Sequence, residues 1–119
     1  MNSLSEEEIY QEIGKIVEPF QRLECFECAQ AVLSWLKQNR VQGTLLKLRT
    51  KYRDEFIMSS RWERSGSTES ISTNGVHCGV EVRDKVFDNL SSEGLTREAW
   101  INDFACRRGV FVVEELERV

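Results

Sequence analysis

The amino-acid sequence predicts an α+β fold in which N-terminal helices pack on an antiparallel sheet. Over the first forty residues, apolar side chains recur every three or four positions, as in amphipathic helices. From residue 44 onward, short segments with strand-like apolar patterns are separated by turn residues. No repeat and no long linker divides the chain, and 40% of its residues are hydrophobic. We therefore expect residues 1–119 to form a single domain with one continuous core.

Two helices are predicted near the N-terminus. The first covers residues 6–17, because Ser5 and Glu8 have the spacing of a capping box and Pro19 cannot continue a helix. The second covers residues 25–39, where the residues expected on the buried face recur at helical intervals: Cys25, Ala29, Val32, Leu33 and Leu36. Cys25 therefore lies in the first turn of the second helix.

The sheet is predicted to begin with residues 44–52 and 54–60, paired as a hairpin that turns at residues 53–54. Basic residues alternate over residues 47–53, which predicts a solvent-facing surface of a strand that carries Lys47, Arg49, Lys51 and Arg53. Residues 59–75 are rich in Ser, Thr, Glu and Gly, and we expect them to form a long surface loop.

Residues 76–82 alternate as a strand does, so His77 and Cys78 point to opposite faces of the sheet. Residues 85–89 follow a turn at Asp84 and are the expected antiparallel partner. Thr96 can cap a short helix over residues 97–104, with Trp100 and Phe104 facing inward, and residues 110–116 form a last strand.

Charge and hydropathy exclude several classes of function. The net charge of -4 is unfavourable for a protein that binds phosphates, so we expect no nucleic-acid partner. No apolar run approaches the ~20 residues of a membrane helix, and the acidic N-terminus is unlike a secretory signal. We therefore expect no membrane association and a cytoplasmic protein in the cell that makes it.

Four cysteines in a reducing compartment suggest a thiol, a metal ligand or a catalytic thiolate more than disulfides. The first turn of a helix favours a thiolate, which makes Cys25 a candidate nucleophile. His77, the single histidine of the chain, is the candidate base. Asp88, at the end of the next predicted strand, is the candidate for orienting His77, and Asn89 is a possible substitute.

Other interpretations of the same residues remain open. Cys25 and Cys28 form a CxxC pair, which could belong to a zinc site or a redox site. A zinc site lacks convergent ligands, because His77 and Cys78 point apart and Cys106 is then left alone. We therefore expect neither a metal nor a cofactor. Each candidate residue could also be merely structural, Cys25 as a buried thiol and Asp88 as a residue at a strand end.

Three segments resemble the papain-fold toxin domains (type 2) of bacterial polymorphic toxin systems: CFECAQAVLSWLKQNRVQG, STNGVHCGVEV and VFDNLSSEGLTREAW. The resemblance implies a papain-like fold in which Cys25 is the nucleophile, His77 the base and Asp88 the orienting residue. It also implies that an amide can replace the Asp88 carboxylate. For the oxyanion hole, Gln21 is the nearest candidate glutamine, and the backbone N–H of Cys25 is the alternative.

The resemblance further implies a toxin effector that acts as a cysteine-dependent amide hydrolase. The expected reaction is deamidation of a glutamine in a target-cell protein, with proteolysis or transglutamination as alternatives from the same acyl chemistry. The implied partners are that protein substrate and a cognate immunity protein, and the implied destination is the target-cell cytosol. The rival hypothesis is a non-catalytic binding or adaptor domain on the same scaffold.

Overall fold

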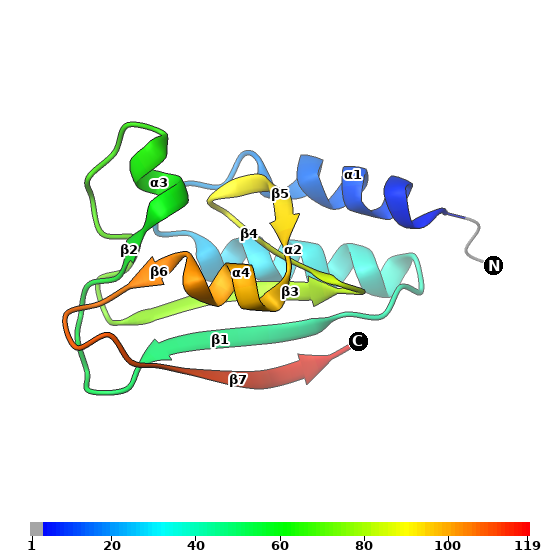
Figure 1. Cartoon of the computed structure of the whole chain (residues 1–119). Helices are drawn as coiled ribbons and strands as arrows, with labels where there is room; N and C mark the ends of the chain where they lie inside the picture. The colour runs from blue at the N-terminus through cyan, green and yellow to red at the C-terminus, as the bar shows by residue number, and fades with distance from the viewer. Residues whose placement is uncertain (1–3) are drawn as a thin grey trace.

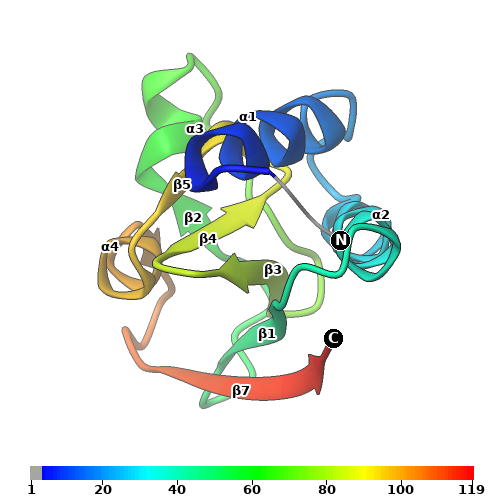
Figure 2. The same ribbon diagram turned by 90° about the vertical axis from the view of Figure 1, so that its right-hand side faces the viewer.

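The computed structural model describes residues 4–119 and contains two sheets with helices on both sides of the larger one (Figures 1 and 2). The elements, in chain order, are α1 (Glu6–Val17), α2 (Cys25–Gln38), β1 (Thr44–Thr50), β2 (Met58–Ser59), α3 (Ser60–Arg64), β3 (Val76–Val82), β4 (Lys85–Asp88), β5 (Ser91–Leu95), α4 (Arg97–Asn102), β6 (Phe104–Ala105) and β7 (Phe111–Arg118). The large sheet has the order β5-β4-β3-β1-β7, and β2 pairs with β6. All of these strand pairs are antiparallel.

The two N-terminal helices form as the sequence predicts. Ser5 caps α1 through a full capping box, in which its hydroxyl accepts from Glu8 N at 3.2 Å and its own N–H donates to the Glu8 carboxylate at 3.1 Å. The helix buries Ile9, Ile13 and Val17. The second helix begins at Cys25 and buries Ala29, Val32, Leu33 and Leu36 as its periodicity predicts. Cys25, also expected on the buried face, is only partly buried, whereas Cys28 is buried.

The large sheet separates two apolar layers. On one face, α1 and α2 pack against Leu45, Val80 and Phe87. On the other face, Leu46, Leu48 and Val86 pack with side chains from the α3, α4 and β6 region, among them Trp62, Trp100 and Phe104. Residues of β3 therefore alternate between the two layers, so that Cys78 faces the long helices while His77 faces the aromatic rings of Trp100 and Phe104. The expected inward positions of Trp100 and Phe104 are confirmed.

The predicted hairpin between residues 44–52 and 54–60 is wrong. A strand has two edges, and both edges of β1 are occupied, one by β3 and the other by β7. The chain leaves β1 at Thr50 and turns through Arg53, whose φ of 61° is in the left-handed region. Residues 58–59 then pair with residues 104–105 instead.

The predicted surface loop at residues 59–75 is wrong in part. Its beginning forms the short helix α3, which Ser59 caps through a hydrogen bond from Trp62 N. Ile71 and Ser72 are buried, and the Ser72 hydroxyl donates to Glu55 O at 2.7 Å. Strand β5 was also not predicted, because its sequence SSEGL has no strand-like apolar alternation.

Within residues 4–119, no helix is both long and apolar enough to cross a membrane.

Candidate active site

Cys25 is the first residue of α2, and its side chain is half-buried. No side chain caps this helix end, because the carboxylate of Glu24 accepts instead from Gln21 N at 2.7 Å. Among the described residues, no side chain accepts from the N–H groups at the start of α2, and their partial positive charge favours a thiolate at Cys25.

His77 is fully buried, with its ring 5.0 Å from that of Phe104 and 6.1 Å from that of Trp100, measured between centroids. Its Nε2 lies 2.9 Å from Asp88 Oδ2. Its Nδ1 has no hydrogen-bond partner of its own among the described residues. A proton on Nε2 that is held by Asp88 leaves Nδ1 as the nitrogen that can exchange a proton with Cys25.

Asp88 ends β4 with a fully buried side chain that accepts five hydrogen bonds. Its Oδ2 accepts from His77, from Trp100 Nε1 at 2.9 Å and from Arg61 Nη2 at 2.8 Å. Its Oδ1 accepts from Arg61 Nη1 at 2.9 Å and from Leu90 N at 3.0 Å. A carboxylate with this many donors is fixed in orientation, and it fixes the His77 ring in turn.

Arg61 is the counterion of Asp88, with a side chain that is 10% exposed. The guanidinium bridges two acids, because its Nε donates to Asp103 Oδ2 at 2.9 Å while both terminal nitrogens donate to Asp88. Asp103 also accepts from the Ser59 hydroxyl and from Arg61 N. This network ties α3 and the end of α4 to the carboxylate behind His77.

Gly79 makes room for this arrangement. A Cβ at Gly79 would lie 2.9 Å from Trp100 Cζ2 and 2.9 Å from Val86 Cγ1, which is too close for either neighbour. The absence of a side chain between His77 and Glu81 on this face lets the Trp100 indole approach and donate to Asp88.

The electrostatics of the site favour a charged pair. Burial alone would raise the pKa of Asp88, but His77 and Arg61 together hold that pKa well below its usual range. Burial lowers the pKa of His77, yet the hydrogen bond to Asp88 and the neighbouring Cys25 outweigh it, so the pKa is raised to about 9. A hydrogen bond from the Cys78 thiol opposes burial and, with the nearby His77 ring, lowers the pKa of Cys25. Both directions favour a thiolate at Cys25 and an imidazolium at His77 near neutral pH.

The other buried thiols behave differently. Burial and the charges of Asp88 and Cys25 raise the pKa of Cys28 to about 12. The hydrogen bond to Cys25, together with burial, raises the pKa of Cys78. The raised pKa values keep these two side chains protonated at neutral pH, so Cys25 is the candidate nucleophile of this cluster.

Comparison with known proteins identifies the family of this chain. A family model described as papain fold toxin 2 matches residues 8–105, a range that includes Cys25, His77 and Asp88. The chain belongs to the papain fold toxin 2 family. No curated protein and no solved structure matches it. Family membership confirms the expected papain-like fold, with helices N-terminal to an antiparallel sheet.

Two auxiliary residues predicted from the sequence lie near the site in different roles. Asn89 is buried and donates through Nδ2 to the backbone oxygens of Gln21 and Arg22, at 2.6 and 3.1 Å. It therefore anchors the segment that leads into α2, and its described hydrogen bonds do not include His77. Gln21 is exposed, and its described contacts are through its backbone. The oxyanion role of its side chain stays a prediction.

Arg61 and Asp103 are the site residues that the sequence did not indicate. Arg61 lies in the segment predicted to be a loop, and Asp103 lies at the end of the predicted short helix. One feature of the sequence could have indicated Arg61. Ser59 is a good helix-capping residue, and a short helix that begins after it carries a basic residue back over the sheet.

Metal binding by this papain fold toxin 2 domain can be tested directly. Within residues 4–119, no group of three His, Cys, Asp or Glu side chains converges on a point where a metal could bind. We expect the purified protein to contain less than about 0.1 zinc per chain and a chelator to leave its melting temperature unchanged, because structural zinc needs four ligands. One zinc per chain by elemental analysis would contradict the catalytic assignment of Cys25.

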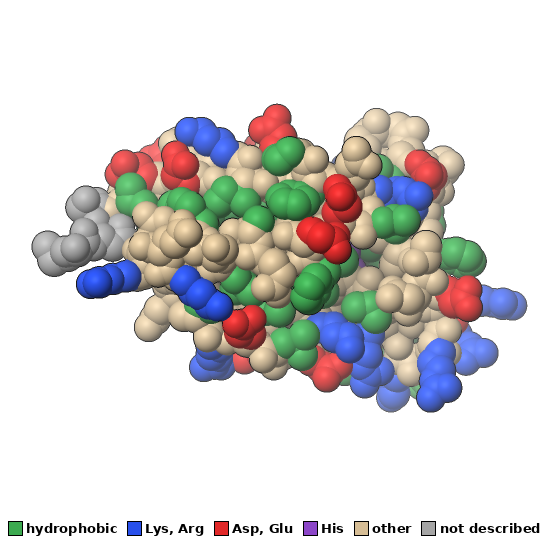
Figure 3. Space-filling model, turned by 180° about the vertical axis from the view of Figure 1, so that it is seen from behind, with side chains coloured by type: hydrophobic (Ala, Val, Ile, Leu, Met, Phe, Trp, Pro, Cys, Tyr) green, Lys and Arg blue, Asp and Glu red, His purple; other side chains and the backbone are tan. Residues whose placement is uncertain are grey.

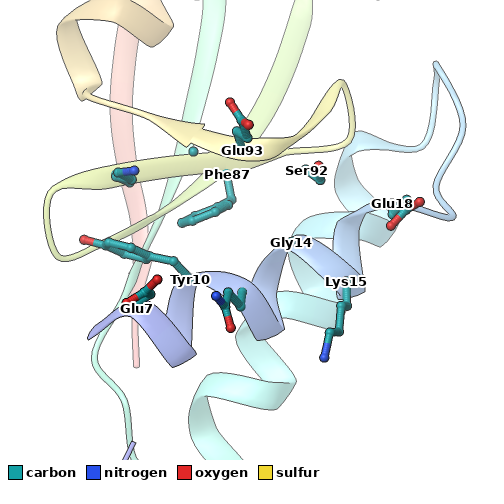
Figure 4. A pocket seen from close by; sticks show the side chains of 11 residues that line it. Glu7, Tyr10, Gly14, Lys15, Glu18, Phe87, Ser92 and Glu93 are labelled. Carbon is teal, nitrogen blue, oxygen red and sulfur yellow. The ribbon is translucent and has the colours of Figure 1, made fainter. Parts of the chain in front are cut away.

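The molecule also has a groove of about 550 Å³ away from these residues, between α1 and the β4–β5 hairpin (Figure 4). Tyr10 and Phe87 line it, and their rings are 5.6 Å apart. At Gly14, α1 comes so close to β5 that a Cβ would lie 2.8 Å from Ser92 O. Neither Cys25 nor His77 lines this groove, so we do not assign it to the catalytic chemistry.

Proposed function

We propose that this papain fold toxin 2 domain is a cysteine-dependent amide hydrolase that modifies a protein in a target cell. Cys25 acts as the nucleophile, His77 carries the proton and Asp88 orients His77. The observation that carries the proposal is the buried His77–Asp88 pair, with Nδ1 of the ring left without a partner beside a cysteine at a helix N-terminus.

The reaction follows from the protonation states of this pair. The Cys25 thiolate attacks the carbonyl carbon of an amide, and the carbonyl π electrons move to the oxygen. N–H groups at the start of α2, which no side chain caps, are available to stabilise that oxyanion. The His77 imidazolium then gives its Nδ1 proton to the leaving nitrogen, which departs as ammonia or an amine and leaves a thioester on Cys25. In the second half, His77 takes a proton from water, the hydroxide attacks the thioester, and Cys25 is released.

Deamidation of a glutamine side chain is the proposed reaction, and cleavage of a peptide bond is the alternative. Leu23 and Phe26 flank the nucleophile in the sequence and are 47% and 54% exposed, which suits contact with a protein chain. The proposed partners are this substrate and an immunity protein in the producing cell, and the proposed place of action is the target-cell cytosol.

The test is intact-mass analysis of target-cell proteins after exposure to the purified domain. A gain of about one dalton in one protein indicates deamidation, whereas fragments indicate proteolysis, and both require the thioester route. The same exposure with the Cys25→Ala variant should leave every mass unchanged. Equal modification by that variant would refute the proposal, and no modification by the wild-type domain would favour a binding or adaptor domain.

The lowered pKa of Cys25 predicts how fast it reacts at different pH values. The carbamidomethylation rate of Cys25 by iodoacetamide should change less than about threefold between pH 8 and pH 6, whereas an ordinary thiol slows roughly 75-fold. The sign follows from the thiolate fraction, which stays near one until the pH falls to the lowered pKa. Peptide mapping separates this rate from that of Cys28, whose raised pKa of about 12 should make it slow throughout. A steep decline in the labelling rate of Cys25 between pH 8 and pH 6 would mean that Cys25 and His77 do not form an ion pair.

A further inference from the structure

Basic side chains gather at one end of a chain whose net charge is -4. They come from β1, from the turn after it and from the segment before β7, and Figure 3 shows Lys and Arg side chains concentrated at the lower right of that view. We call this surface the basic end; it consists of Lys47, Arg49, Lys51, Arg53, Arg107 and Arg108.

The basic end adjoins the candidate nucleophile. In the register of the sheet, Lys47 is opposite Cys78, so both side chains lie on the face that α2 covers in part. Cys78 in turn hydrogen-bonds to Cys25, and the positive charge of Lys47 acts on the pKa of Cys78. In Figure 1, the N-terminal end of α2, the start of β3 and the end of β1 all lie at the left side of the molecule. The basic end is therefore on the same side of the molecule as Cys25.

Most of these cations have no acidic partner. Among the described residues, Lys47, Lys51, Arg53 and Arg107 form no ion pair, and only Arg49 does so, with Glu114 at 3.0 Å. On the far side of the sheet, by contrast, Arg97 is paired with two acids, Glu81 and Glu115. Unpaired cations on one side of an acidic protein produce a local positive potential that attracts anionic partners.

Exposed apolar side chains lie among the cations. Tyr52 is 47% exposed and Phe56 is 60% exposed. The charged groups of Lys51 and Arg108 lie 5.5 and 5.8 Å from the centre of the Tyr52 ring. A depression of about 490 Å³ opens beside them, lined by Phe56 and by Arg53 and Arg107, among others. This surface therefore offers apolar contacts between its positive charges.

Acidic residues lie within the basic end, and they favour an acidic polypeptide over a nucleic acid as the anion bound there. Asp54 and Glu55 lie directly beside Arg53, and Glu114 lies beside Arg49. A phosphate backbone has closely and evenly spaced charges, which these carboxylates would repel. A polypeptide can place its own carboxylates at the cations and its apolar side chains at Tyr52 and Phe56.

We propose that the basic end binds an acidic segment of the protein substrate that flanks the amide attacked by Cys25. This deepens the proposed function and rests on it. Asp and Glu side chains of the substrate pair with the unpaired cations, and neighbouring apolar side chains contact the exposed rings. The binding holds the target amide beside the thiolate, which raises specificity for acidic proteins.

Fluorescence anisotropy with the Cys25→Ala variant of this 119-residue chain tests this proposal. The probes are two fluorescein-labelled peptides with a central glutamine and the same aromatic residues, one flanked by Asp and Glu and the other by Lys, and a single-stranded oligonucleotide. We expect the acidic peptide to bind at least about tenfold more tightly than the lysine peptide in low salt, and to weaken severalfold as salt rises from about 50 to 300 mM.

A matched pair of charge reversals localises the effect. Lys51→Glu with Arg53→Glu should weaken binding of the acidic peptide at least about tenfold. Arg40→Glu with Arg83→Glu makes the same charge change, and Arg40, Arg53 and Arg83 have similar φ values of 56°, 61° and 56°. Arg40 follows the C-terminal end of α2 and Arg83 lies in the β3–β4 turn, both remote from Cys25, so this control should leave binding unchanged.

Several results would overturn the proposal: equal binding of the two peptides, no binding of either, equal losses in both double variants, or tighter binding of the oligonucleotide. Failure of the proposed function is seen separately. It appears as slow iodoacetamide labelling of Cys25 in the wild-type domain. This labelling is measured without either peptide, so its result is independent of peptide binding.

Discussion

Alanine at either Cys25 or His77 is expected to slow amide hydrolysis at least about a thousandfold, and the double variant is expected to be little worse than either single one. The reason is that the thiolate and the imidazolium form one charged pair, in which each raises the population of the reactive form of the other. Without Cys25, His77 has no thioester to form or release, and without His77, Cys25 has no group to protonate the leaving nitrogen. The measurement is the rate at which the mass-shifted product appears, compared for the wild-type domain and the three variants.

Cys28→Ala provides the matched control for this experiment. Cys28 is buried one turn farther along α2, and its raised pKa keeps it a thiol. Its replacement should keep the rate within about threefold of wild type, with at most a modest loss of stability from the lost sulfur. Because His77 is buried, circular dichroism of His77→Ala must show a folded protein before its rate is interpreted. Rate losses that multiply in the double variant, or an inactive Cys28→Ala, would contradict a shared step at Cys25.

Signals that are local in the sequence predicted the elements that carry the candidate catalytic side chains. The capping box at Ser5 and the apolar period from Cys25 each lie within one helix, so they set the start of α1 and α2 without knowledge of the rest. The alternation in residues 76–82 similarly assigned His77 and Cys78 to opposite faces. These signals identify the helix start that carries Cys25 and the strand that carries His77, but they do not place the two elements relative to each other.

Pairing between distant segments could not be predicted in the same way. The two edges of β1 bind β3 and β7, and nothing in residues 44–60 alone distinguishes those partners from a local hairpin. Arg61 shows the same limit for the site. Its hydrogen bonds reach 27 residues along the chain to Asp88 and 42 residues to Asp103, and one arginine among many has no sequence feature that marks it as buried.

These distant contacts change what is expected of Asp88. The resemblance to papain-like sites implies that an amide can replace the carboxylate, but here both oxygens of Asp88 accept hydrogen bonds. Oδ1 faces Leu90 N and Arg61, and Oδ2 faces His77, Trp100 and Arg61. In whichever orientation an asparagine is placed, its NH₂ group points at N–H donors.

Asp88→Asn is therefore expected to be nearly as damaging as Asp88→Ala, with at least about a hundredfold loss of activity and a loss of about 3 kcal/mol in the free energy of unfolding. The stability loss follows because Arg61, which is 10% exposed, keeps only Asp103 as an acidic partner. The pKa of His77 should fall from about 9 toward its ordinary value, because the carboxylate that raises it is gone. The alkaline limit of activity should move to lower pH accordingly, since the imidazolium that protonates the leaving nitrogen is lost at lower pH.

The Arg61→Met variant distinguishes two effects of Asp88→Asn: the clash between the asparagine NH₂ group and the N–H donors of Arg61, and the loss of the carboxylate itself. If the guanidinium is what an amide at Asp88 cannot accommodate, the Asp88→Asn, Arg61→Met double variant should be more stable than the sum of the two single losses predicts, with a coupling energy of about 1 kcal/mol or more. Activity should recover less than stability, because the orienting carboxylate is still absent and His77 still has the lower pKa. Urea unfolding and the pH profile of the rate, measured for the four proteins of this cycle, provide the two readouts. Wild-type activity and stability in Asp88→Asn would show that the five hydrogen bonds to this carboxylate do not control the orientation of His77.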